Sequence, residues 1–151
     1  MEAGDRRWPV TAHQDDNKQK RYVRHVGDTS RFTLGHAFSC AQDGLRYGLI
    51  TQRNFKIHAF FAILAIVLSV VLGTSTAEWC AIILCIIGVF ALELANTAVE
   101  SAIDLISPEW SELAKRAKDC AAASVYVAAL GSVVIAGIVF VPKLLALWGV
   151  G

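Results

Sequence analysis

Charged residues are scarce in this chain. Of its 151 residues, 18% are Asp, Glu, Lys or Arg and 55% are hydrophobic, whereas about 25% of residues are charged in a typical soluble domain. So few charges cannot cover a water-facing surface, which argues against a soluble monomer, a disordered chain or a coiled coil. The basic residues are also uneven, because ten of the fourteen precede residue 57. This split predicts a polar N-terminal segment followed by a membrane-embedded body.

Several familiar motifs are missing. The four cysteines form no CxxC or Cys/His finger spacing, which argues against a zinc site. No glycine is followed by Lys-Ser or Lys-Thr, so the phosphate-binding P-loop is absent, and so is the glycine-rich loop of protein kinases. Residues 1–30 contain no apolar run that could serve as a cleavable signal peptide, and we expect them to form a flexible polar cytoplasmic tail. We expect no nucleic-acid partner.

Apolar runs predict an all-α membrane protein, with residues 31–151 forming one membrane domain. An amphipathic helix at 31–52 is too polar to cross a bilayer and is expected to lie on its surface. In it, Gly44 and Gly48 form a GxxxG pattern that permits close helix approach. The transmembrane helices, which need about 20 apolar residues each, are expected at about 57–73, 79–106 and 120–141, the last ending at Pro142.

The distribution of basic residues predicts the orientation. The N-terminal segment and the loop at 107–119 are basic, whereas the turn at 73–78 has no Lys or Arg. Because cytoplasmic loops carry the excess of Lys and Arg, the N-terminus and the 107–119 loop are expected in the cytoplasm. The C-terminus is then expected outside the cell membrane.

The second apolar run contains polar residues that a membrane helix normally avoids. Five of them fall within roughly 100° of one another on the helix: Glu93, Asn96, Thr97, Glu100 and Asp104. A carboxylate at a helix centre costs about 2.5–3.5 kcal/mol, so this polar stripe should face a cavity, a metal ion or another helix. One carboxylate can act as a general base and another can hold a divalent cation. Together with the lysines that follow, they indicate phosphoryl transfer.

Three other roles are compatible with the same stripe. The carboxylates could form a structural seam that holds helices together, or fix the assembly of a non-enzymatic membrane scaffold. They could also serve a small oligomeric cation or proton conductor. A conductor should have polar residues along the whole span, whereas the half from Trp79 to Leu92 is apolar, which disfavours this interpretation.

Two motifs resemble the small prokaryotic diacylglycerol kinase/undecaprenol kinase family. One is LELANTAVE at 92–100 with Asp104, and the other is LAKRAKDCAA at 113–122. The stretch RNFKIH at 53–58 is similar to the Gram-positive branch, which favours undecaprenol. The resemblance covers roughly residues 30–143. It implies an integral membrane lipid kinase that works as a homotrimer and transfers the γ-phosphoryl group of MgATP to a lipid hydroxyl.

The resemblance also implies roles for individual residues. Glu93 would be the general base, and Glu100 would bind the Mg²⁺ that accompanies ATP. A further set would bind the nucleotide or shape its site: Lys118, Asp119, Asn96, Glu109, Trp110 and Ser111.

One position departs from the family pattern. Gln52 stands where the family usually has a glutamate that helps to bind the metal. An amide oxygen can coordinate Mg²⁺ but brings no negative charge. We therefore expect weaker or altered metal dependence, and a catalytically impaired family member is the alternative.

Overall fold

The computed structural model describes residues 34–149, which contain four helices and no strand. The tail expected at 1–30 lies outside the described residues. The chain divides into two compact units, residues 1–37 and 38–151, and the packing below concerns the second unit. The helices are α2 (Leu34–Thr51), α3 (Arg53–Val71), α4 (Thr76–Ile106) and α5 (Glu112–Leu147).

Three of these helices, α3, α4 and α5, are long and apolar enough to cross a membrane. The shortest, α3, has 19 residues, which gives about 28 Å at 1.5 Å per residue, close to the hydrocarbon thickness of a bilayer. Large apolar side chains stay exposed on them, such as Phe60, Val70 and Val133. An apolar surface of this kind is suited to lipid or another membrane helix. The all-α membrane fold predicted from the sequence is confirmed.

The helices are longer than the apolar runs. α3 begins directly after Gln52, the single non-helical residue that separates it from α2. A charge-free run marks the part of a helix suited to hydrocarbon, whereas the helix itself can extend through polar residues. α5 likewise starts at Glu112, after Ser111, whose hydroxyl accepts a hydrogen bond from the Ala114 N–H.

The charge-free run expected to span the membrane stops at Pro142, but the helix itself does not. α5 continues through Pro142 to Leu147, although proline removes one backbone hydrogen bond and crowds the preceding turn. Ending the helix within an apolar segment would leave more backbone groups without partners, and this is costly in lipid. The residue after the proline, Lys143, pairs with Glu78 on α4 at 3.2 Å, which also favours a continuous helix here.

The turn between α3 and α4 has a clear local cause. Gly73 has φ +60°, a left-handed conformation that glycine adopts readily. Ser75 then caps α4 in a reciprocal capping box, in which the Glu78 N–H donates to the Ser75 hydroxyl and the Ser75 N–H donates to the Glu78 carboxylate. This arrangement satisfies two backbone donors at the helix start and fixes the reversal of the chain.

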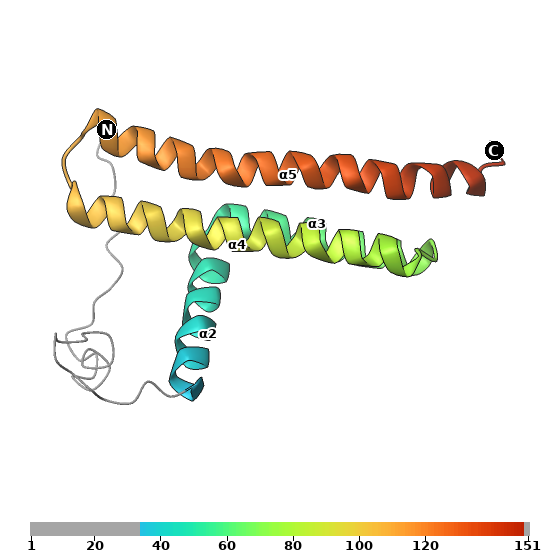
Figure 1. Ribbon diagram of the computed structural model, residues 1–151, viewed down its shortest axis with the longest axis horizontal. Coiled ribbons are helices and arrows are strands. Elements are labelled where there is room, and N and C mark those ends of the chain that lie inside the picture. The colour runs from blue at the N-terminus through green and yellow to red at the C-terminus, as the bar shows by residue number, and fades with distance from the viewer. Residues whose placement is uncertain (1–33, 150–151) are drawn as a thin grey trace. The chain divides into compact units, whose positions relative to one another are not determined.

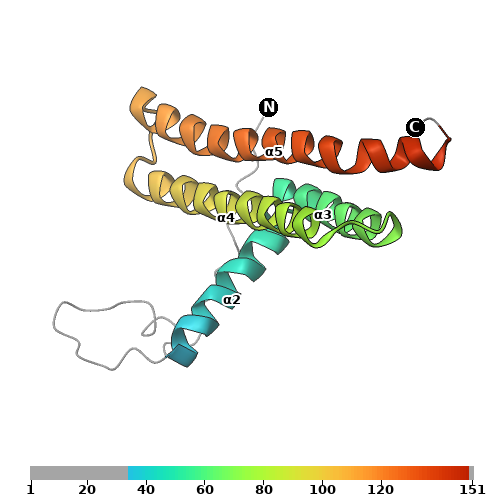
Figure 2. The same ribbon diagram turned by 45° about the vertical axis from the view of Figure 1, so that its right-hand side comes forward.

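α4 and α5 lie side by side and form most of the packing between helices, with α3 packed beside α4 (Figures 1 and 2). Ile82 on α4 meets Val139 and Phe140 on α5, and Ala65 and Leu68 of α3 pack against this cluster. Nearer the α2 end of α3, the rings of Phe55 and Phe90 lie 4.7 Å apart. These contacts bring three helices together along the N-terminal half of α4.

The two glycines of the GxxxG pattern have different surroundings. A Cβ atom at Gly48 would lie 3.1 Å from Leu94 and 3.2 Å from Phe55, whereas a Cβ atom at Gly44 would meet nothing within 4 Å. The close approach predicted from this pattern therefore occurs at Gly48 and not at Gly44.

This difference predicts unequal effects of the same substitution. Gly48→Val should lower the thermal unfolding temperature, because overpacking typically costs about 1–3 kcal/mol. Gly44→Val is the matched control, since it makes the same change in the same helix without the close neighbours. Thermal unfolding in detergent measures both, and equal unfolding temperatures would contradict the close contact.

Candidate active site

The polar stripe of α4 faces the interior over part of its length. Glu93, Asn96 and Thr97 have exposed fractions of 2%, 7% and 6%. The Thr97 hydroxyl donates to the Glu93 carbonyl oxygen at 2.9 Å, so it is satisfied within its own helix. Glu100 is half-buried and the side chain of Asp104 is 68% exposed. The stripe therefore runs from a buried carboxylate to an exposed one.

Glu93 and Asn96 line a pocket of about 260 Å³ between α3, α4 and α5. Asn54, Ile57 and His58 form its α3 side, and the α5 side contains four residues: Ala122, Val125, Tyr126 and Ala129. The prediction that the stripe faces a cavity is confirmed for Glu93 and Asn96. A buried carboxylate beside a small cavity is placed to act on a bound group.

Sequence reasoning missed two polar residues of this pocket. Asn54 and His58 are four residues apart on α3, so they lie on the same helical face, and both line the pocket. The i, i+4 spacing was a signal that could have linked the two residues to each other, but nothing in the sequence linked them to α4.

A larger, apolar cavity adjoins the polar one. Its volume is about 360 Å³, and it is lined by side chains of α3, α4 and α5 such as Phe61, Val89 and Ile135. Ile57, His58 and Ala129 line both cavities. Together they present a polar end at Glu93 and an apolar continuation within the helices, which suits an amphipathic molecule.

Asn96 is hydrogen-bonded to one acidic residue of the stripe, Glu100. Its amide nitrogen donates to the Glu100 carboxylate at 3.0 Å, which fixes which way the amide points. The amide oxygen is buried and has no hydrogen-bond partner in the described part of the chain. Because an unsatisfied buried acceptor is costly, this oxygen is suited to a donor or a cation brought by a ligand.

The oxygen atoms present fit a magnesium ion that arrives with a nucleotide. Among residues 34–149, no group of three or more His, Cys, Asp or Glu side chains could hold a metal ion. Mg²⁺, however, is usually held by one or two carboxylates together with substrate phosphates and water. Glu100 would supply a carboxylate, and the unpartnered oxygen of Asn96 would supply a neutral ligand or orient a bound water.

Gln52 precedes α3 and is half-buried, and its side chain makes no capping hydrogen bond with that helix. It does not line the polar pocket. Glu100, the other predicted metal ligand, does not line this pocket either, so the structure brings neither of them into the pocket that Glu93 lines.

The predicted lysine and its neighbour have different partners. Lys118 on α5 pairs with Asp104 on α4, so the lysine reaches the end of the polar stripe. Asp119 pairs with Lys115 at 2.5 Å within α5, and both of these side chains are more than half exposed. Of the two predicted nucleotide-binding residues on α5, only Lys118 reaches the stripe.

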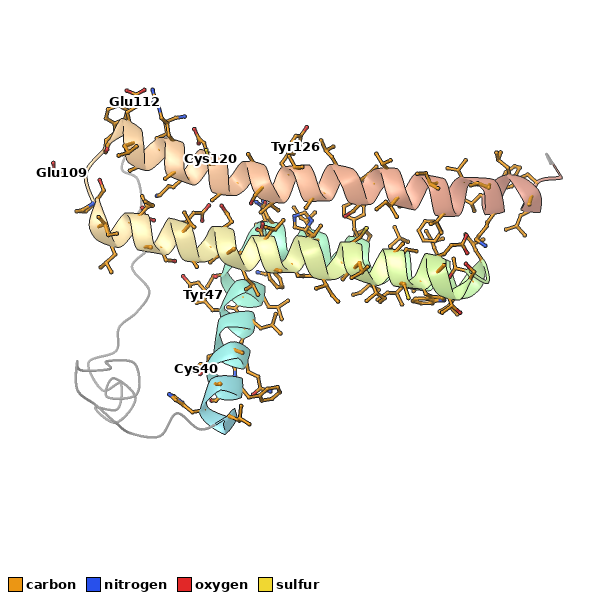
Figure 3. The ribbon with its side chains drawn as sticks, in the orientation of Figure 1. Cys40, Tyr47, Glu109, Glu112, Cys120 and Tyr126 are labelled. Atoms are coloured by element: carbon orange, nitrogen blue, oxygen red, sulfur yellow. The ribbon has the colours of Figure 1, made fainter. Side chains whose placement is uncertain are left out.

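The other predicted nucleotide contacts lie in the connection between α4 and α5. Figure 3 shows Glu109 at this connection and Tyr126 further along α5. Trp110 is 82% exposed, the Glu109 carbonyl accepts a hydrogen bond from the Ser107 hydroxyl at 3.1 Å, and Ser111 caps α5. This short segment lies at the same end of α4 as Asp104.

The structure thus has membrane-length helices around a buried carboxylate, with a carboxylate and a lysine beyond it, and this arrangement is compatible with a membrane-embedded phosphotransferase. The family described as prokaryotic diacylglycerol kinase matches residues 39–140. The chain therefore belongs to the prokaryotic diacylglycerol kinase family and is a lipid kinase.

Individual relatives show the same similarity. The undecaprenol kinase of Bacillus subtilis is 40% identical over 80% of this chain and 96% of its own length. The diacylglycerol kinase of Synechocystis is also 40% identical, over 74% of this chain and 64% of its own length. The diacylglycerol kinase of Escherichia coli is 31% identical over 72% of this chain and 90% of its own length.

Proposed function

We propose that this protein transfers the γ-phosphoryl group of ATP to the hydroxyl of a membrane lipid, with undecaprenol favoured over diacylglycerol. The observation that carries the proposal is the pair of adjoining cavities, one with the buried Glu93 and one apolar. A lipid with one terminal hydroxyl and a long hydrocarbon chain matches both. The Bacillus relative, a kinase of undecaprenol, supports this acceptor.

In the proposed reaction the Glu93 carboxylate accepts the proton as the lipid O–H bond breaks. The lipid oxygen forms a bond to the γ-phosphorus, the bond from that phosphorus to the β,γ-bridging oxygen breaks, and ADP leaves with that oxygen. Bound Mg²⁺ would neutralise phosphate charge, with Glu100 and Asn96 as its ligands or as hydrogen-bond partners of its waters. Lys118 and Asp119, together with Glu109, Trp110 and Ser111, would bind the nucleotide from the cytoplasm.

The orientation and assembly belong to the same proposal. The N-terminus and the α4–α5 connection face the cytoplasm, where ATP is found, and the C-terminus lies outside. The exposed apolar side chains of the three long helices allow a homotrimer within the membrane. α2 would lie at the membrane surface.

The proposal is tested with purified protein, labelled ATP and mixed micelles that contain either undecaprenol or diacylglycerol. Transfer of label to undecaprenol at the higher kcat/KM is expected, and preferential labelling of diacylglycerol would overturn the acceptor assignment. Absence of transfer to both lipids would indicate an impaired family member or another role. A measurement of ion flux through liposomes containing the protein tests the alternative of a cation or proton conductor. The apolar side chains of Ile82 and Val89 on the buried side of α4 disfavour this alternative.

A glutamate at position 52, as the family usually has, should reduce the Mg²⁺ concentration that the reaction needs. We expect Gln52→Glu to lower the Mg²⁺ concentration for half-maximal rate by about fivefold, because a second carboxylate adds charge to the metal site. Thr51→Glu is the control, since it adds the same charge at the neighbouring position. A rate measured against Mg²⁺ concentration decides the matter, and identical curves for Gln52→Glu and the unchanged protein would count against a metal role at this position.

A further inference from the structure

One ion pair joins α4 and α5 at the end of the polar stripe. Lys118 and Asp104 are 14 residues apart in the sequence, on opposite sides of the connection between the helices. The side chain of Lys118 is 34% exposed and that of Asp104 is 68% exposed. Asp104 has no role in the function proposed above, although it continues the stripe that contains Glu93 and Glu100.

The neighbouring cations of α5 are held differently. Lys115 pairs with Asp119 at 2.5 Å and Arg116 pairs with Glu112 at 2.6 Å, and both pairs join residues four apart within α5. Among the cations described in the first turns of α5, Lys118 alone forms an ion pair with α4. The partner that draws it there is Asp104.

The position of Asp104 on α4 determines where the Lys118 ammonium group lies relative to Glu100. Asn96, Glu100 and Asp104 follow one another at steps of four residues, which places them on one helical face about 6 Å apart along the axis. An ammonium group held at Asp104 therefore lies about one turn beyond Glu100. Phosphate groups bound at Glu100 through a metal ion would lie within reach of this ammonium group.

Stability alone does not explain an acidic residue here. An ion pair whose carboxylate is mostly exposed contributes little to stability, because water screens the charges and ordering long side chains costs entropy. By contrast, a lysine has a flexible stem, so a fixed partner strongly affects where its charge is found.

We propose that Asp104 is a positioning residue that holds the Lys118 ammonium group towards the nucleotide phosphates. This inference rests on the proposed function, which assigns phosphate binding to Lys118. Asp104 touches no reacting atom itself. Its effect should appear in the binding of MgATP and not in the chemical step.

The test compares the KM for MgATP among variants at saturating lipid. Asp104→Asn should raise this KM about fivefold, as expected for coupling within one ion-pair network, while kcat stays within about twofold. Asp104→Glu keeps the negative charge, so its KM for MgATP should stay close to that of the unchanged protein. Glu112→Gln is the matched control, because it breaks an ion pair at the same end of α5 that does not include Lys118.

A double variant separates positioning from a general loss of structure. In a Lys118→Met background, Asp104→Asn should cause no further rise in KM, because the lysine that it positions is gone. An additional rise of the same size, or an unchanged or lower KM for the single variant Asp104→Asn, would overturn the proposal. Circular dichroism checks that each variant keeps its helices.

Failure of the proposed function is distinguished by measuring binding directly. If the unchanged protein transfers no phosphate to either lipid, the kinase proposal fails. The dissociation constant of MgATP, measured by equilibrium dialysis in detergent, then replaces KM. A fivefold higher dissociation constant in Asp104→Asn, with no such increase in the Lys118→Met background, would support the positioning role. Equal dissociation constants for Asp104→Asn and the unchanged protein would overturn it.

Discussion

Glu93→Gln is expected to lower kcat for lipid phosphorylation by about a thousandfold, within the range that general acid–base catalysis contributes. Glutamine has nearly the same shape, so it should fill the pocket without disturbing α3 or α5, but its amide cannot accept the hydroxyl proton. The KM for MgATP should change little, because in the proposed reaction Glu93 acts on the lipid hydroxyl, whereas Asn96 and Glu100 serve the metal ion. Initial rates with saturating lipid and MgATP measure the effect.

Glu78→Gln provides the matched control. It makes the same chemical change on the same helix, but in the first turn of α4, where Glu78 takes part in the capping box and pairs with Lys143. It should reduce thermal stability slightly and leave kcat close to that of the unchanged protein. Retained transfer in Glu93→Gln would remove this residue from the role of general base, and an equal loss in both variants would indicate a structural effect.

Much of the fold could be predicted because its signals are local. A charge-free run of membrane length identifies a spanning helix without knowledge of its neighbours, and all three such runs became long helices. The helical period placed Glu93, Asn96 and Thr97 on one face, and all three are buried. The cost of polar groups in a membrane then makes that face the inner one.

The features that could not be predicted depend on which helix faces meet. Gly44 and Gly48 are equivalent in the sequence, but only Gly48 lies against Phe55 and Leu94. Lys118 was expected at the nucleotide because of a motif, whereas its pairing with Asp104 requires the register of α5 along α4. His58 was one scattered histidine among four until α3 placed it in the pocket with Glu93.

Glu100→Gln should lower the rate about a hundredfold at low Mg²⁺ and lose less as Mg²⁺ rises, because a metal ligand has lost its charge. The amide oxygen of glutamine can still accept the hydrogen bond from Asn96 that the Glu100 carboxylate accepts at 3.0 Å. Glu100→Ala removes this acceptor as well, so it should cost more and recover less. Rates measured across a range of Mg²⁺ concentrations separate the two effects, and an unchanged Mg²⁺ requirement in Glu100→Gln would contradict a metal role.

The double variant Gln52→Glu/Glu100→Gln makes the assignment sharper. It moves one carboxylate from α4 to the start of α3 and leaves the total charge unchanged. If both side chains bind the same metal ion, the double variant should regain part of the rate that Glu100→Gln loses, because mutations at one site are not additive. If Gln52 lies outside the metal site, the two substitutions should act independently, and metal binding in this chain would then depend mainly on Glu100.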